Sequence, residues 1–198
     1  MAIERIPENN TLIVGLGNPG PEYRNSRHNA GFMVAEALAG KLEIPLKKVK
    51  FKAQIGTGKV EGIPVIIAKP LTFMNTSGQA VAPLVHYYKV PLERLLVIHD
   101  DMDLPLGVLR LRPGGGSAGH NGMLSIFDKL GTNAFPRLRI GVGRPPGRMD
   151  PAAYVLQNFQ ASEEELKKMV IDQACAAVLT FISDGLERAM NIYNGEVG

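Results

Sequence analysis

The sequence of 198 residues has one cysteine, no tryptophan and no long apolar segment. The single cysteine, Cys175, excludes an internal disulfide, and no group of cysteines and histidines has the spacing of a zinc site. No stretch approaches the ~20 apolar residues that cross a membrane, and the first ten residues, MAIERIPENN, lack the apolar run of a secretory signal. We therefore expect a cytoplasmic protein with no membrane partner.

The mixture of 45% apolar and 21% charged residues suits one well-covered core, so we expect a single domain over residues 11–198 behind an N-terminal extension of residues 1–10. Short β-branched segments alternate with segments of helical period, which predicts an α/β domain with a twisted mixed β-sheet and helices on both faces. The expected strands cover residues 11–15, 54–59, 65–70, 95–100, 108–112 and 138–142. The mixed character follows from Glu61 and Gly62, which predict a hairpin between the second and third strands.

Helices are expected at four places between these strands. One covers residues 29–42, a second covers residues 81–89, and a short third helix follows the glycine-rich segment PGGGSAG and ends at Gly131. A long final helix begins at Ser162, because Ser162 and Glu165 have the spacing of a capping box.

The formal net charge is only +3, but basic residues are concentrated in the second half of the chain. Residues 105–148 contain seven basic residues and one acidic residue, whereas residues 149–198 contain three basic and eight acidic residues. A further basic cluster consists of Lys47, Lys48, Lys50 and Lys52. Ordinary solvated charge and a polyanionic partner both fit the first segment, and the lysine cluster favours the polyanion modestly.

The segment GLGNPG at residues 15–20 matches the glycine fingerprint of dinucleotide-binding proteins and follows a predicted strand. In that fingerprint the glycines open a helix whose N-terminus faces the pyrophosphate. Here Pro19, Gly20 and Pro21 continue into Tyr23 before any helical period begins. The context therefore disfavours a dinucleotide cofactor and leaves a turn that places Asn18 after the first strand.

Five polar residues are predicted at one edge of the sheet, where strands end and helices begin. Asn18, Asn75 and Asp100 follow predicted strands, Asn121 follows the glycine-rich segment, and His28 precedes a helix. Open α/β sheets bind ligands at such an edge. An aspartate that accepts a hydrogen bond from one imidazole nitrogen leaves the other nitrogen able to take a proton from water, and asparagine amides can stabilise an oxyanion.

Each of these residues has an ordinary structural alternative. A lone histidine such as His28 is more often structural than catalytic, and only the pairing with Asp100 favours catalysis. We interpret His86 and His99 as structural and His120 as a residue that positions the loop. The three asparagines are also common in turns and caps.

Two other chemistries are open to the same residues. Asp100, Asp101 and Asp103 together could hold Mg²⁺, but the sequence has no phosphate-cradling loop, which favours Asp100 as the partner of His28. No serine lies in a G-x-S-x-G elbow, since Ser26, Ser77 and Ser117 lie in loops or caps. Direct attack by water on an activated ester is the simpler hypothesis.

Taken together, five segments resemble the bacterial-type peptidyl-tRNA hydrolases. They are GLGNPGPEYRNSRHNAGF at 15–32, PLTFMNTSG at 70–78, the segment around VIHDDMDLPLG at 97–107, GHNG at 119–122 and FPRLRIGVGRP at 135–145. Their order matches the family from residue 11 to about residue 190, so the resemblance is far more specific than any one motif.

The resemblance implies hydrolysis of the ester between a peptide, or an N-blocked aminoacyl group, and the 3′ end of tRNA, with no cofactor and no metal. It implies that His28 is the general base, that Asp100 keeps His28 basic and that Asn18 distinguishes N-blocked substrates. It also implies a channel for the acceptor end and the peptide, lined by Tyr23, Phe73, Met74, Asn75 and Asn121. In the family a basic pair binds the 5′-terminal phosphate of tRNA; Arg112 and Arg139 match it, with Arg110 nearby.

One departure from the family is Ala118, where relatives commonly have a second glycine; we expect altered kinetics and retained activity. Two other functions remain open. An RNA-binding module on this fold would lack hydrolysis, against which the retained His28 and Asp100 argue. A small-molecule esterase would leave the basic segment unexplained. We expect a monomer, because one tRNA end needs one site.

Overall fold

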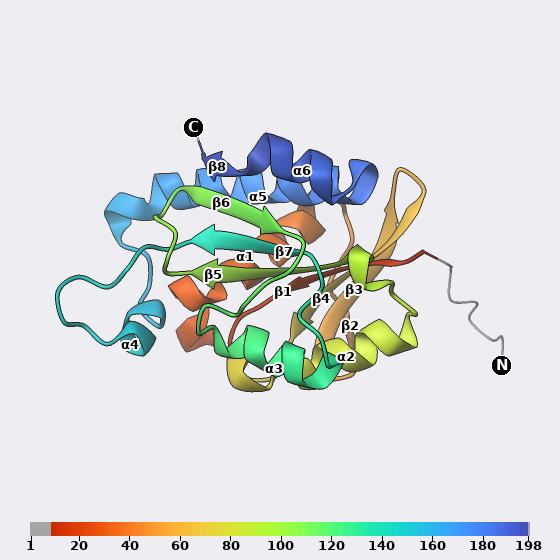
Figure 1. Cartoon of the computed structure of the whole chain (residues 1–198), viewed down its shortest axis with the longest axis horizontal. Coiled ribbons are helices and arrows are strands. Elements are labelled where there is room, and N and C mark those ends of the chain that lie inside the picture. The colour runs from red at the N-terminus through yellow and green to blue at the C-terminus, as the bar shows by residue number, and fades with distance from the viewer. Residues whose placement is uncertain (1–8, 198) are drawn as a thin grey trace.

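The computed structural model describes residues 9–197, so most of the proposed N-terminal extension, residues 1–10, lies outside the described residues. Across the described part of the chain, one sheet of eight strands has the order β2-β3-β4-β1-β5-β7-β6-β8 (Figure 1). The strands are β1 Thr11–Gly15, β2 Lys48–Lys50, β3 Ala53–Val60, β4 Ile63–Pro70, β5 Leu95–Asp101, β6 Val108–Arg112, β7 Arg137–Gly141 and β8 Gly195–Glu196.

The centre of the sheet is parallel and its edges are antiparallel. Strand β1, whose five residues are all buried, pairs in parallel with β4 and β5, and β5 pairs in parallel with β7. Strands β3 and β4 form the predicted hairpin around Glu61 and Gly62, with Val60 opposite Ile63. The mixed sheet predicted from the sequence is confirmed. Parallel pairing brings the carboxyl ends of β1 and β5 to the same edge, where the candidate site lies.

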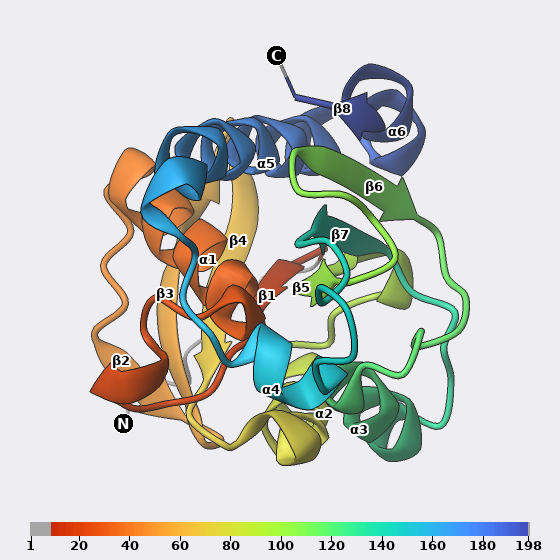
Figure 2. The same ribbon diagram turned by 90° about the vertical axis from the view of Figure 1, so that its left-hand side faces the viewer.

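Helices cover both faces of the sheet, as predicted. Helices α1 (Ala30–Lys41), α5 (Glu164–Asp184) and α6 (Leu186–Tyr193) lie on one face, and α2 (Gly78–Tyr87) and α3 (Asn121–Leu130) lie on the other (Figure 2). Each face has its own apolar core, one around α1 and α5 and the other around α2 and α3. None of the helices in the described residues is long and apolar enough to span a membrane.

Several local predictions need correction. The capping box uses Gln160 and Glu163 instead of Ser162 and Glu165, and α5 begins at Glu164 after a short 3-10 turn. Helix α2 begins at Gly78, three residues earlier than predicted, where a Cβ would meet the Ser125 carbonyl oxygen of α3 at 2.1 Å. Such close packing of two helices depends on tertiary structure, which local periodicity does not contain. Strands β2 and β8, helix α6 and the short helix α4 (Pro151–Val155) were not predicted.

Candidate active site

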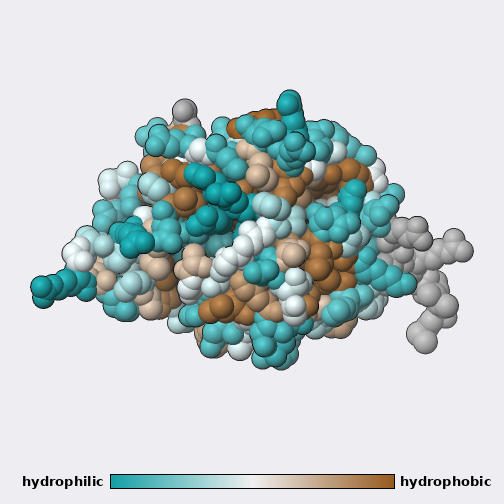
Figure 3. Space-filling view, viewed as in Figure 1, coloured by the Kyte–Doolittle hydropathy of each residue, from teal (hydrophilic) through white to brown (hydrophobic). Residues whose placement is uncertain are grey.

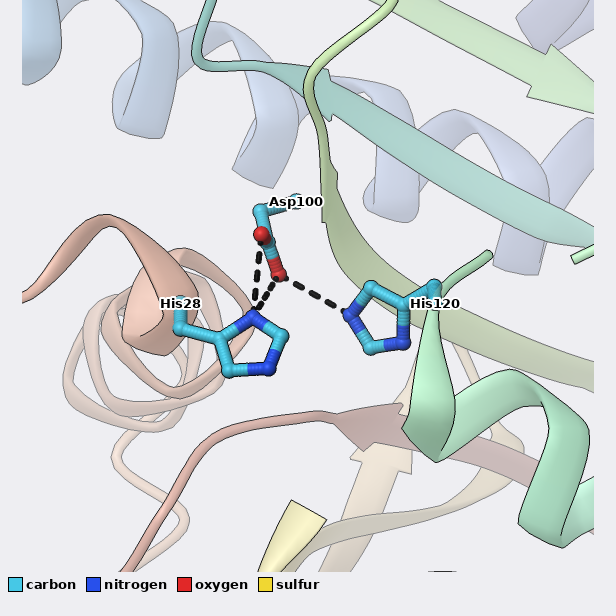
Figure 4. Close-up of side chains that lie close together, drawn as sticks. All are labelled: His28, Asp100 and His120. Carbon is cyan, nitrogen blue, oxygen red and sulfur yellow. Dashed lines mark hydrogen bonds and ion pairs between the residues drawn. The ribbon is translucent and has the colours of Figure 1, made fainter. Parts of the chain in front are cut away.

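His28 and Asp100 come together from two different elements at the carboxyl edge of the sheet. His28 lies in a 3-10 turn, Arg27–Asn29, directly before α1, and Asp100 is the sixth residue of β5. The Nδ1 atom of His28 lies 2.9 Å from Oδ1 and 3.0 Å from Oδ2 of Asp100 (Figure 4). Because a carboxylate only accepts, Nδ1 donates, and the Nε2 atom of His28 keeps a lone pair.

His120 is a second histidine on the same carboxylate. Its Nε2 atom lies 3.0 Å from Oδ1 of Asp100, and its Nδ1 atom accepts a hydrogen bond of 3.3 Å from the backbone N–H of Met123 as the N-cap of α3 (Figure 4). These partners assign the proton of the neutral ring to Nε2. His120 therefore joins the loop to the pair of His28 and Asp100, which is more than the positioning role expected for it from the sequence.

A third histidine, His99, supports the main chain beside this group. Its Nδ1 atom donates to the backbone oxygen of Asp100 at 2.8 Å, and its ring lies 4.8 Å from that of His120, edge to face. Burial, aided by the neighbouring His120, lowers the pKa of His99 to about 3, so the ring is neutral at physiological pH. This agrees with the structural role predicted for His99.

The electrostatics of the site follow from one buried carboxylate and two imidazole donors. Burial raises the pKa of Asp100, but the charges and hydrogen bonds of His28 and His120 outweigh it and hold that pKa far below its usual range. Burial also lowers the pKa of His28, yet the charge and hydrogen bond of Asp100 raise it further, to above its ordinary value of 6.5. The pair therefore consists of an ionised aspartate and an imidazole of increased basicity.

The amide of Asn18 is held in one orientation by the backbone. Its Oδ1 atom accepts the N–H of Met74 at 2.8 Å, and its own backbone N–H donates to Oδ1 of Asn29 at 2.8 Å. Because the oxygen is engaged with Met74, the Nδ2 donors of Asn18 are directed elsewhere. Gly17, in the same turn, would place a Cβ 2.6 Å from the ring of Phe32, so this glycine serves close packing of the turn on α1.

Two cavities adjoin His28. One, of about 420 Å³, brings together six of the predicted site residues with two residues of the α4 region, and its lining consists of Asn18, His28, Phe73, Met74, Asn75, Asn121, Ala152 and Leu156. The other, of about 280 Å³, lies against Asp100, His120 and residues 117–119 of the glycine-rich loop. Tyr23 is half-buried in the 3-10 turn Pro21–Tyr23 and is absent from the described lining of both cavities.

The aspartates predicted as an alternative Mg²⁺ site point to separate partners. Asp100 contacts the two histidines, Asp101 accepts from Arg139 Nε at 2.5 Å, and Asp103 pairs with Arg144 at 2.5 Å. Across residues 9–197 the group with a metal-ligand arrangement is His28, Asp100 and His120, whose ligand atoms lie within 4.8 Å of one another. A metal ion bound there would take the place of the imidazole protons that His28 and His120 donate to Asp100.

Comparison with known proteins decides the family. A family model described as peptidyl-tRNA hydrolase matches residues 12–197. The chain is 50% identical over 181 residues to the peptidyl-tRNA hydrolase of Mycolicibacterium smegmatis, which covers 91% of this chain and 95% of that protein. The chain belongs to the peptidyl-tRNA hydrolase family. It is also 50% identical over 184 residues to the peptidyl-tRNA hydrolase of Chloroflexus aggregans, with 92% of this chain and 98% of the relative covered.

Solved structures agree with this assignment. The crystal structure of peptidyl-tRNA hydrolase from Acinetobacter baumannii superposes with a TM-score of 0.87 at 42% identity, covering 93% of this chain and 95% of that one. The resemblance on which the sequence predictions rested is therefore confirmed, and with it the α/β fold.

The three arginines predicted to contact phosphate lie on one face of β6 and β7. Arg110 is directly opposite Arg139, while Arg112 is exposed and lies opposite Arg137. Hydrophilic side chains gather over β6 in the space-filling view (Figure 3). Of the three, Arg139 is held by its ion pair with the buried Asp101.

Arg137, which the sequence analysis did not single out as a site residue, holds the glycine-rich loop of this peptidyl-tRNA hydrolase family member in place. Its guanidinium is buried and donates to the carbonyl oxygens of Gly115 and Gly116 at 2.8 and 3.0 Å and to that of Asn133 at 2.7 Å. Burial, with a smaller effect of Arg139, lowers its pKa to about 10, so the side chain keeps its charge. The loop that leads to His120 is therefore anchored at its first half.

Arg27 anchors the opposite wall of the site. It is 2% exposed and donates to the carbonyl oxygen of Asn158 at 2.5 Å and to Glu163 at 2.7 Å, and it stacks over the ring of Tyr154 at 4.6 Å. This residue directly precedes His28, so it ties the turn Arg27–Asn29 to the α4 segment that lines both cavities. Its partners lie more than 120 residues along the chain, so no local pattern predicts the contact.

Proposed function

We propose that the chain hydrolyses the ester between a peptide, or an N-blocked aminoacyl group, and the 3′ end of tRNA, using a water molecule that His28 activates as general base. Hydrolysis of peptidyl-tRNA is the activity of the family to which the chain belongs. The reaction returns tRNA from prematurely released peptidyl-tRNA to translation. The observation that carries the mechanism is the pairing of His28 Nδ1 with Asp100 while His28 also borders the asparagine-lined cavity.

The proton movements follow from this arrangement. Nε2 of His28 takes a proton from water as the oxygen attacks the ester carbonyl, and the ionised Asp100 stabilises the imidazolium that forms. Nδ2 donors of Asn18, with those of Asn75 and Asn121, stabilise the tetrahedral oxyanion. When the intermediate collapses, the ester C–O bond breaks and His28 returns the proton to the ribose oxygen. We also assign to Asn18 the discrimination of N-blocked substrates, which is the role that the resemblance to the family implies.

The two cavities provide room on both sides of the ester. We assign the larger one, with Phe73, Met74 and the three asparagines, to the peptide, because amides pair with peptide groups and apolar rims accept varied side chains. The smaller one, beside Ser117 and His120, accepts the terminal nucleoside. Arg110, Arg112 and Arg139 bind the 5′-terminal phosphate, and Tyr23 lies along the path of the acceptor end.

We also infer that the protein acts as a monomer, because one tRNA end needs one site, and that it works in the cytoplasm, where translation takes place. The scheme assigns no step to a metal or a cofactor. The tRNA substrate is the partner.

The test compares substrates. Wild-type protein should release the acyl group from N-acetylated aminoacyl-tRNA much faster than from the unblocked aminoacyl-tRNA, and Asn18→Ala should reduce that preference. The same N-acetylated amino acid presented as a methyl ester should be a poor substrate. Preferred cleavage of the methyl ester would support a small-molecule esterase, and tRNA binding without release would support an RNA-binding module.

A further inference from the structure

A cavity of about 650 Å³, larger than either catalytic cavity, opens beside the C-terminal end of α2. Its lining includes Lys48 and Lys50 of β2, Lys59 of β3, and Tyr87 and Tyr88. No acidic side chain is among its described lining residues. We call it the lysine–tyrosine groove. The first turn of α2 follows Asn75 of the catalytic cavity, and a helix of this length spans roughly 15 Å, so the groove lies about one short helix away from the site.

The lysines of the groove face the same side of the sheet. Lys48 lies opposite Ile55 and Lys50 opposite Ala53, and both of these partners belong to the apolar core under α2 and α3. Lys59 follows Ile55 by four residues, so strand alternation turns it to the same side. The three lysines therefore lie on one side of the sheet and border the same cavity.

Within the described part of the chain, these lysines form no ion pair with a carboxylate. Among residues 9–197, the lysines that form ion pairs with carboxylates are Lys41, Lys69, Lys129 and Lys167, none of which borders the groove. The Lys50 ammonium instead lies 3.3 Å from the centre of the Tyr87 ring. A set of ammonium groups interleaved with aromatic rings is the arrangement by which proteins hold phosphates and stacked bases.

The groove shares its face of the sheet with the arginines. Leu109, Leu111 and Leu138 pack against the core on the α5 side, so the alternating Arg110, Arg112 and Arg139 face the α2 and α3 side. The strands that carry the two basic regions, β2 and β3 for the lysines and β6 and β7 for the arginines, lie toward opposite ends of the sheet, with the α2–α3 layer against its face (Figure 2). In the strand order, β3 and β6 are five strand spacings apart, or roughly 24 Å, a distance that a ligand as large as tRNA can bridge.

We propose that the lysine–tyrosine groove binds the phosphodiester backbone of the tRNA body, as a second RNA contact separate from the arginines. This rests on the proposed function, which makes tRNA the polyanion that reaches this face. Lysines supply point charges to phosphates, and each phosphate that they neutralise releases counterions. Binding to tRNA is then stronger and more salt-dependent than the arginines alone would make it.

The experiment measures the dissociation constant of deacylated tRNA at several salt concentrations. The groove variant carries Lys48→Gln, Lys50→Gln and Lys59→Gln. The matched control carries Lys41→Gln, Lys167→Gln and Lys168→Gln, which lie in α1 and α5 on the opposite face of the sheet, with the same change in net charge. The groove variant should bind at least about tenfold more weakly near 0.1 M salt, and the slope of log affinity against log salt should become shallower by about 2 to 3. The control should stay close to wild type. Melting curves establish that both variants are folded.

Two outcomes would overturn the groove as an RNA contact: unchanged affinity and slope in the groove variant, or an equal loss in the control, which would indicate long-range attraction without contact. Hydrolysis of N-acetylated aminoacyl-tRNA by the wild type is measured in parallel. If the wild type releases the acyl group and the groove variant binds tRNA as tightly as the wild type, the groove is rejected as an RNA contact and the proposed function stands. If the groove variant loses tRNA affinity but the wild type releases no acyl group, the proposed function is rejected and the groove stands as an RNA contact.

Discussion

His28 and His120 contact the same oxygen of Asp100, at 2.9 and 3.0 Å, and their ring centres are 4.9 Å apart. One buried negative charge is therefore divided between two imidazoles. The second nitrogen of His120, Nδ1, accepts a hydrogen bond from the backbone N–H of Met123. The second nitrogen of His28, Nε2, has no such backbone partner among the described residues. The two histidines are therefore not equivalent: in the proposed mechanism His28 exchanges protons, and we predict that His120 sets how strongly Asp100 acts on it.

Removing His120 should change the pH dependence of the reaction. In His120→Ala, Asp100 loses one donor and its charge acts more fully on His28, so the pKa of His28 rises. The base works deprotonated, and the carboxylate of Asp100 already raises the pKa of His28 in the wild type. The acid limb of kcat/KM against pH should therefore move to still higher pH in His120→Ala. The other charged groups of the site, Asp101 and Arg139, pair with each other and stay in place.

The exposed His86 provides the control for this profile, because His86→Ala removes an imidazole from α2 without touching Asp100. An acid limb that stays in place in His120→Ala, or that moves equally in His86→Ala, would contradict the shared-carboxylate account.

Replacing Asp100 by asparagine should abolish most turnover while leaving tRNA binding intact. The amide can donate to Nδ1 of His28, which moves the ring proton to Nε2 and removes the lone pair that takes the proton from water. We expect kcat to fall about 10² to 10⁴-fold, the usual contribution of a positioned base. Single-turnover rates and the dissociation constant of deacylated tRNA separate chemistry from binding. A variant with near-normal kcat would mean that Asp100 is not required to orient His28.

Arg27 should matter for both stability and substrate affinity. Arg27→Met keeps the apolar stem but removes the donors to Asn158 and Glu163, so we expect a loss of about 3 kcal/mol in the free energy of unfolding. Because α4 lines both cavities, KM should rise more than kcat falls. Urea unfolding and steady-state kinetics measure the two effects.

Glu163→Gln is the milder partner of this substitution, since it keeps the backbone contacts of Arg27 and removes one partly exposed ion pair. It should cost about 1 kcal/mol or less. Equal losses from the two variants would show that the ion pair, and not the contact with the α4 segment, stabilises this wall.

Ala118 occupies a backbone conformation that favours glycine, with φ of 49°. Ala118→Gly should relieve roughly 1 kcal/mol of strain, partly offset by the greater freedom of the unfolded chain, so stability should stay equal or increase. Activity should be retained with altered KM. The neighbouring Gly119, with φ of 77°, gives the opposite test: Gly119→Ala should destabilise by about 1 to 2 kcal/mol in thermal unfolding. A destabilised Ala118→Gly variant would contradict this.

The sequence predicted the fold well where the pattern is local. The buried run of β1 and the turn at Glu61 and Gly62 specify a strand and a hairpin by themselves, and both are found. Gly131, at φ of 70°, ends α3 as predicted. The capping box was assigned to the wrong residues because glutamine, here Gln160, is a rarer N-cap than serine, here Ser162. Strand β2 was not predicted because its lysines obscure the residue pattern of a strand.

The members of the site and the pairing of His28 with Asp100 were predicted from the sequence, but the other contacts that hold the site were not. Asn18, His28, Asn75 and Asn121 line one cavity, and Asp100 joins His28, although their catalytic roles remain predictions. The second donor on Asp100 and the two buried arginines were missed. A hydrogen bond such as the one between Arg27 and Asn158 connects residues 131 positions apart, and nothing in either local sequence records it.

The central claim is that His28 is the base that activates water, and the most direct measurement is the rate of acyl release from N-acetylated aminoacyl-tRNA by wild type and His28→Ala in the presence of EDTA. The account predicts that wild-type release survives chelation, while His28→Ala loses at least about 10²-fold in rate and still binds deacylated tRNA with unchanged affinity. Near-normal release by His28→Ala would contradict the claim. So would loss of wild-type release in EDTA, which would make His28, Asp100 and His120 candidates for a metal site.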